Sequence, residues 1–325
     1  MFELSSEEES HQTALRLSQN APQYLEKSAI GGASGPFSFL SGSESLEAWT
    51  TYEQLLLSCL RTKDDKSALL CLKKLISRFG PSSERLAALQ GLYEEATAAD
   101  DLALDKLLSE YETIILNDPT NTHVLKRRVA LLQDLSRQTD AIEALTELLE
   151  TSPTDVEAWA ELSDLYVSQA MYPQAIFCLE EVLLIAPNAW NIHARLGEIS
   201  YLNSLSSSNS NEAAIERLLV AATRHYCRSI ELCEGYLRGL YGLKLTTDRF
   251  LEVVQRDDRR EGAHKANSDA TGSPSLPLQD MRMLNKKTTK ILKSIVRGKE
   301  AGNFSHLGYS DSEVGAVKDL LGMSS

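Results

Sequence analysis

The sequence predicts an all-α fold in which short amphipathic helices pair into hairpins along the chain. Apolar residues recur at helical spacing from Leu46 onward with almost no interruption. The composition agrees, because Ala, Leu, Ser and Glu are abundant and only 6% of the residues are aromatic. Prolines in a fixed register separate successive units of the pattern. These three observations favour a repeat of helix pairs over a fold that contains a sheet.

The repeat is clearest in the segment EAWAELSDLY and in the segment AIFCLEEVLLIAP that follows it. The first helix carries an aromatic, a leucine and a second aromatic residue three and four positions apart, which places them on one face. The second helix carries a small residue, a leucine and a closing proline. In chain order these residues are Trp159, Leu162, Tyr166, Ala175, Leu179 and Pro187. This order is typical of the tetratricopeptide repeat, a helix hairpin with a period of 34 residues.

The 34-residue period also extends to the neighbouring repeats. Counting back from Pro187 in steps of 34 reaches a proline each time, at Pro153 and at Pro119. A proline ends each unit because it cannot continue a helix. The same register yields further packing positions, namely Leu145, Leu196 and Gly197. We therefore predict a superhelical solenoid of about five to six hairpins, in which all of these residues serve packing.

The pattern divides the chain into four parts. We expect an N-terminal helix, interrupted at Pro22, and a flexible linker in residues 1–45. The solenoid should occupy residues 46–255. A low-complexity loop should follow in residues 256–280, where apolar periodicity is lost, and C-terminal capping helices should occupy residues 281–325.

The segment 284–297 carries the one strongly basic stripe of the sequence. Its apolar residues fall on one helix face and its cations on the opposite face, at Lys286, Lys290, Lys293 and Arg297. One interpretation is the solvated outer face of a capping helix, since the ends of a solenoid need polar surfaces. The other is attraction to anionic headgroups at a membrane surface.

Charge and hydropathy exclude several classes of protein. The formal net charge of −13 argues against nucleic acid as a partner, because phosphate binding needs clustered Lys and Arg. The opening MFELSSEEESH is acidic where a secretory signal would be basic. No run of residues approaches the ~20 apolar positions of a membrane span. We expect a cytosolic protein.

The sequence contains no motif that predicts catalysis, and we expect neither a cofactor nor a metal. Phosphate-binding, zinc-protease and serine-hydrolase signatures are missing from the sequence. The five cysteines form no CxxC pair, and the six histidines are scattered. The chain is therefore predicted not to be an enzyme.

Binding is the remaining class, and the repeat indicates where it would occur. In a tetratricopeptide superhelix the first helix of each hairpin lines a concave groove. The residues at groove spacing are His123, Lys126, Gln133, Glu157, Asp164, Asn191, Glu198 and Tyr201. Simple solvation of this inner face is the alternative for each of them.

Grooves of this kind can clamp the C-terminal carboxylate of a chaperone with lysine and asparagine. Here the asparagine places hold Ala130, Asp164 and Glu198. Two acids would repel a carboxylate, so the charges disfavour a co-chaperone adaptor. A folded partner or a basic helical segment fits this mixed groove better. A scaffold of a soluble complex stays open as a further alternative.

Two segments resemble subunit 2 of the endoplasmic reticulum membrane protein complex, in a fungal-like form. They are NDPTNTHVLKRRVALLQ and EAWAELSDLYVSQAMYPQAIFCLEEVLLIAPNAWNIHARLGEISY. The DPTN entry with the following KRR, and the phrase AIFCLEEVLLIAPN, are more specific than generic repeat residues. The resemblance covers about residues 110–245.

The resemblance implies a non-catalytic scaffold subunit that lies peripherally on the cytosolic face of the endoplasmic reticulum membrane. Such a complex supports insertion of the transmembrane helices of tail-anchored and multi-spanning proteins. The solenoid would hold cytosolic parts of membrane-embedded subunits, notably subunits 3 and 5. It would also contact a paralogous subunit 8 or 9 where one exists.

Overall fold

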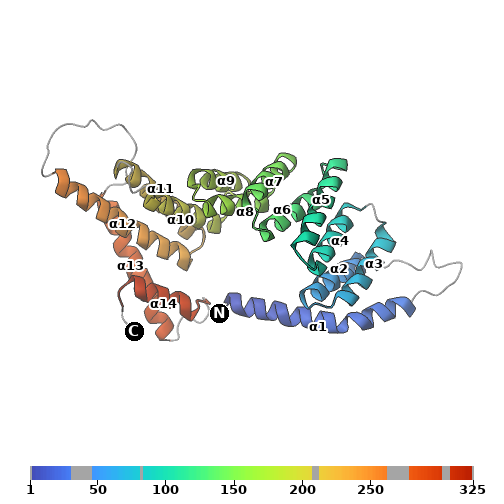
Figure 1. Cartoon of the computed structure of the whole chain (residues 1–325). Coiled ribbons are helices and arrows are strands. Elements are labelled where there is room, and N and C mark those ends of the chain that lie inside the picture. Colours follow the sequence, from blue (N-terminus) through green and yellow to red (C-terminus); the bar gives the residue numbers. More distant parts are fainter. Residues whose placement is uncertain are drawn as a thin grey trace. The chain divides into compact units, whose positions relative to one another are not determined.

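All regular secondary structure in the part of the chain described here is helical (Figure 1). The computed structural model describes residues 2–30, 46–80, 83–206, 212–261, 278–301 and 308–323. These residues form two compact units, one of Glu3–Pro153 and one mainly of Thr154–Ser325. The predicted all-α class is confirmed. None of the described helices combines the length and the apolar character that a membrane-spanning helix needs.

The N-terminal unit is built from seven helices among its described residues, in successive pairs (Figure 1). They are α1 (Phe2–Ile30), α2 (Leu46–Arg61), α3 (Asp65–Phe79), α4 (Glu84–Thr97), α5 (Asp101–Asn117), α6 (Thr122–Asp134) and α7 (Gln138–Thr151). Helices α2 and α3 pack as one hairpin, and α6 and α7 pack as another. Helix α4 packs more closely against α6 than against its hairpin partner α5. The first helices of these two successive hairpins, α4 and α6, therefore contact each other.

Helix α1 continues through Pro22, so the interruption expected there is wrong. A proline removes one backbone hydrogen bond, but packing on both sides of it can hold the helix together. Ala21 and Leu25 are buried in a core shared with Leu55 of α2 and Leu72 of α3. In addition, the Lys74 ammonium donates a hydrogen bond of 3.0 Å to the Leu25 carbonyl. These tertiary contacts offset the local cost.

The C-terminal unit also contains seven helices in its described part (Figure 1). They are α8 (Val156–Ser168), α9 (Tyr172–Ile185), α10 (Trp190–Ser206), α11 (Glu212–Leu232), α12 (Leu237–Glu261), α13 (Leu278–Glu300) and α14 (Asp311–Leu320). The pairs α8/α9, α10/α11 and α12/α13 pack as hairpins. Helices α12 and α13 both extend into the segment expected to be a loop, since α12 ends at Glu261 and α13 begins at Leu278. In α12 the added residues, RDDRRE, are mostly good helix formers.

Several expected features lie outside the described residues. They are the Gly- and Ser-rich linker in 31–45, the centre of the Ser-rich insertion at 207–211 and most of the low-complexity segment, 262–277. The division of the chain into four parts therefore stays a prediction.

The residues assigned to repeat packing lie in two kinds of position. The apolar ones lie at helix interfaces. Ala175, Leu179 and Leu196 are buried in one core, with Trp159 and Tyr166 half-buried against it. Leu145 and Leu162 are also buried, and Gly197 packs on a tyrosine of the next helix. The three prolines are exposed in the turns that follow α5, α7 and α9, namely Pro119, Pro153 and Pro187.

The turns of three hairpins, α2/α3, α6/α7 and α8/α9, share one backbone geometry. Lys63, Ser136 and Ala170 have φ of 59°, 58° and 57°, in the left-handed region that residues other than glycine rarely adopt. The next amide in each turn donates back across the helix end, as in the 2.9 Å bond from the Met171 amide to the Tyr166 carbonyl. Such bonds satisfy carbonyls that the helix end would otherwise leave unpaired. The same backbone conformation therefore recurs after 34 residues, at Ser136 and again at Ala170.

Two glycines allow Tyr226 of α11 to pack between α10 and α12. A Cβ atom at Gly242 would lie 2.1 Å from Cζ of Tyr226, and one at Gly197 would lie 2.9 Å from the same ring. Tyr226 is itself buried, with 4% of its surface exposed. The first helices of these two hairpins can approach the tyrosine only because neither glycine carries a side chain.

The substitution Gly242→Ala should therefore destabilise the chain. A methyl group forced against a buried ring costs about 1–3 kcal/mol, because the ring cannot withdraw into a packed core. The measurement is urea unfolding followed by circular dichroism. The matched control is Gly315→Ala in α14, where a Cβ meets nothing within 4 Å. Alanine at 315 should leave stability unchanged or raise it by up to about 1 kcal/mol. Equal effects of the two substitutions would contradict this packing account.

A pair of histidines lies between α10 and α11. The rings of His193 and His225 have centroids 5.9 Å apart, and His193 Nε2 lies 3.2 Å from the carbonyl oxygen of Pro187. Burial, and secondarily the neighbouring His193, lowers the pKa of His225 from 6.5 to about 4. The folded chain therefore resists protonation of His225, while the unfolded chain does not.

We expect the free energy of unfolding to fall as pH drops from 6.5 towards 4, since only the unfolded chain gains the His225 proton in this window. The contribution of His225 at pH 4 is on the order of 2–3 kcal/mol. In the variant His225→Gln the free energy of unfolding should fall less between pH 6.5 and pH 4, by this amount. The control His123→Gln, at an exposed position, should show the same pH dependence as the parent chain. Parallel pH profiles for the parent and His225→Gln would refute the assignment.

Candidate functional site

The predicted groove residues divide between the two units. His123, Lys126 and Gln133 lie on α6 of the N-terminal unit, where His123 is exposed and the other two are half-buried. The remaining five lie on α8 and α10 of the C-terminal unit. Three of them are exposed, namely Glu157, Asp164 and Asn191, and two are half-buried, namely Glu198 and Tyr201. Within the C-terminal unit, two of them belong to one charge network.

This network joins the first helices of three successive hairpins. The Arg195 guanidinium of α10 donates to Asp164 Oδ1 of α8 at 2.8 Å and lies 3.0 Å from Glu198 Oε2. The Arg238 guanidinium of α12 donates to the same Glu198 oxygen at 2.6 Å. Two carboxylates and two guanidinium groups therefore alternate across α8, α10 and α12.

The arginines of this network offset the charge of its two acids. Burial alone would lower the pKa of Arg195, but hydrogen bonds to Asp164 and Glu198 more than offset it and raise that pKa. The four side chains carry no net charge together. The two acids are thus compensated by arginines, and the repulsion of a partner carboxylate expected from the sequence is largely removed.

Aromatic side chains lie beside the network. The rings of Trp190 and Tyr236 meet edge to face, with centroids 4.6 Å apart, and 39% of Trp190 is exposed. Burial raises the pKa of Tyr236, and the nearby Arg238 guanidinium opposes that effect. We name the combined surface the arginine face, made of Asp164, Arg195, Glu198, Arg238, Trp190 and Tyr236. Partly exposed Trp, Tyr and Arg are the residue types that contribute most of the energy of protein interfaces.

The sequence reasoning missed four of these six residues, namely Trp190, Arg195, Tyr236 and Arg238. A signal for Arg195 existed, because it follows Asp164 by 31 residues, just under one repeat. Arg238 follows Glu198 by 40 residues, since the Ser-rich insertion lengthens that repeat. No fixed spacing could have identified it.

The N-terminal unit contains pairs of the same kind. Arg85 of α4 donates to Glu53 of α2 at 2.6 Å, and Arg127 of α6 pairs with Glu95 of α4. Both pairs are separated by 32 residues. The Tyr111 hydroxyl donates a third bond to Glu95 at 2.6 Å, and 9% of the Glu95 side chain is exposed. A carboxylate on one first helix thus pairs repeatedly with an arginine on the next first helix.

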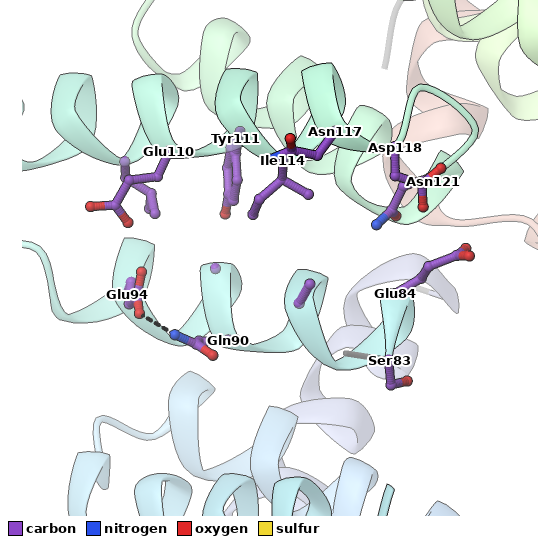
Figure 2. Close-up of a pocket in the computed structure, with 13 residues that line it drawn as sticks. Ser83, Glu84, Gln90, Glu94, Glu110, Tyr111, Ile114, Asn117, Asp118 and Asn121 are labelled. Carbon is purple, nitrogen blue, oxygen red and sulfur yellow. Dashed lines mark hydrogen bonds between the residues drawn. The ribbon is translucent and has the colours of Figure 1, made fainter. Parts of the chain in front are cut away.

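A pocket of about 360 Å³ lies between α4 and α5 in this unit (Figure 2). Tyr111 projects from α5 towards α4, where Gly91 makes room for it, because a Cβ there would lie 2.0 Å from the tyrosine oxygen. Carboxylates and amides form most of the polar lining, and the Gln90 amide donates to Glu94 at 2.9 Å. No cysteine or histidine lines this pocket. Within the described residues, no three His, Cys, Asp or Glu side chains are placed to hold a metal ion.

The chain is similar to proteins of one family. The family described as the EMC2 TPR-like repeat domain matches residues 74–226. The TPR repeat protein oca3 of Schizosaccharomyces pombe is 35% identical over 66% of this chain and 71% of its own length. Subunit 2-A of the ER membrane protein complex of Xenopus laevis is 32% identical over 62% of this chain and 63% of its own length. Subunit 2 of the same complex of Saccharomyces cerevisiae is 28% identical over 58% and 65%.

The matched residues 74–226 run from α3 to α11, so they include the whole of three central hairpins and the residues of the arginine face on α8 and α10. The predicted tetratricopeptide class is confirmed. The chain spans less than two thirds of the length of the Xenopus and yeast relatives. By its repeats and its relatives, this chain belongs to the family of subunit 2 of the ER membrane protein complex.

Proposed function

We propose that the chain is a non-catalytic scaffold subunit of the ER membrane protein complex. The observation that carries this proposal is the family match over the repeats, since relatives from frog and yeast bear the name of this subunit. In this role the chain would support the insertion of transmembrane helices of tail-anchored and multi-spanning proteins. It would lie peripherally on the cytosolic face of the endoplasmic reticulum membrane.

The arginine face is the surface we assign to partner binding. It would hold a cytosolic segment of a membrane-embedded subunit, notably subunit 3 or 5, and a subunit 8 or 9 paralogue would bind elsewhere on the solenoid. Two properties support the assignment. Trp190 and Tyr236 offer aromatic anchors, and 58% of the Arg238 side chain is exposed, so its guanidinium can still donate hydrogen bonds to a partner carboxylate.

Two other functions are distinguishable by experiment. A co-chaperone adaptor gains support from the compensated acids of the arginine face, and it predicts binding of a free acidic C-terminal peptide. A scaffold of a soluble complex predicts that the chain stays in the supernatant when membranes are sedimented.

The first test is affinity purification of the tagged full-length chain from detergent-solubilised membranes, followed by mass spectrometry. We expect a stoichiometric set of multi-spanning membrane proteins. Recovery of soluble chaperones alone would overturn the proposal in favour of the adaptor.

The second test addresses the arginine face. Arg238→Glu would place a carboxylate beside Glu198, so we expect recovery of the membrane proteins to fall about tenfold or more, as for a hot-spot residue. Stability should change by no more than about 1 kcal/mol, because partly exposed ion pairs contribute little.

The matched control for this variant is Arg228→Glu on α11. Arg228 is also exposed and also has one carboxylate partner, Glu231 at 3.2 Å. This control should recover the membrane proteins like the parent chain. If both variants recover the full set, the arginine face is not the binding surface.

A further inference from the structure

Helix α13 presents a continuous basic face to solvent. Five cations recur three and four residues apart along four turns, so they share one side of the helix. All five are exposed, namely Arg282, Lys286, Lys290, Lys293 and Arg297. At 1.5 Å per residue, the stripe is roughly 22 Å long.

Three basic residues near the stripe are instead paired within the chain. Lys244, Lys299 and Lys318 each pair with a carboxylate, at 2.6, 3.3 and 2.7 Å. Within the described residues, the five cations of the stripe form no ion pair with a carboxylate. Their charges are therefore available to a partner, although the chain as a whole carries −13.

The opposite side of α13 fixes the direction of the stripe. Leu292, Ile295 and Val296 are buried in a core with residues of α12 and α14, including Leu240 and Val317. Because this face is already packed, α13 cannot turn its cations inward or insert its apolar side into another surface. The stripe can act only as an electrostatic surface.

The form of the stripe matches a lipid surface better than a protein. The hollow along it, of about 690 Å³, is lined by six polar or charged residues with only Gly298 and Ala301 between them. No aromatic or large apolar side chain lines this hollow, although such side chains form the pockets that hold the anchor residues of a protein partner. Lysine heads on flexible stems suit a field of mobile phosphates, whereas fixed carboxylates favour the arginine fork. Exposed Met283 and Ile291 beside the stripe are compatible with the apolar margin of the headgroup layer.

We propose that the basic face of α13 binds the anionic headgroups of a membrane surface and thereby orients the C-terminal unit on it. The inference rests on the proposed function only in that this function brings the chain to a membrane. Binding to vesicles is a property of the purified chain and needs no other subunit. A failure of either proposal can therefore be recognised separately.

The test is co-flotation of the purified full-length chain with vesicles of phosphatidylcholine, with or without phosphatidylserine. The chain should float only with the anionic vesicles, and ionic strength of about 0.5 M should abolish binding. Removing a basic residue near the surface weakens partitioning about fivefold, so Lys290→Ala with Lys293→Ala should weaken it roughly 25-fold.

The matched control removes two other exposed lysines, Lys66 and Lys73 of α3, and so makes the same change in net charge. This control should bind like the parent chain.

Equal binding by the α13 variant and the parent, or no binding of the parent to anionic vesicles, overturns the proposal. If the α13 variant instead loses a protein partner in membrane purifications while the parent ignores vesicles, the stripe is a protein contact. If the parent chain recovers none of the membrane proteins in the affinity purification, only the proposed function is refuted.

Discussion

The structure depends on one constraint, which is that no helix hairpin can bury its apolar face alone. Each pair has a stripe on one side and needs the next pair to cover it, so stability is shared between neighbours. The core formed by Ala175, Leu179 and Leu196 illustrates this, because it combines residues of one hairpin with the first helix of the next. Small residues make the approach possible, as Gly197 and Gly242 do on either side of Tyr226.

Polar pairs fix how one first helix is aligned along the next, which apolar packing alone does not. A carboxylate on one first helix pairs with an arginine on the next at separations of 31 or 32 residues, as in Glu95 with Arg127 and Asp164 with Arg195. The more exposed of these pairs, such as Asp164 with Arg195, contribute little to stability. Their geometry, however, opposes a slip of one helix along the other, because a shift by one turn would separate the charges. The same side chains leave guanidinium groups partly exposed on the surface that we assign to binding.

The sequence was sufficient for the features that depend on local periodicity. The hairpins, their turns and the packing role of small residues follow from the 34-residue register, and the structure has the predicted apolar packing residues at helix interfaces. Features set by contacts between repeats were not predictable in this way. Arg238 joins the network only because α12 lies beside α10 after a lengthened repeat. Pro22 stays within a helix because tertiary contacts hold α1 on both sides.

The central claim is that the first-helix surface of the C-terminal unit contacts a membrane protein. It is tested most directly by a photo-crosslinking amino acid in place of Asn191, an exposed residue of α10 on the side of Arg195 and Glu198, in intact membranes. The comparison position is Leu184 of the second helix α9, with 75% of its surface exposed. The account predicts an adduct with an integral membrane protein from position 191 and none from position 184. An adduct from position 184 alone would contradict it.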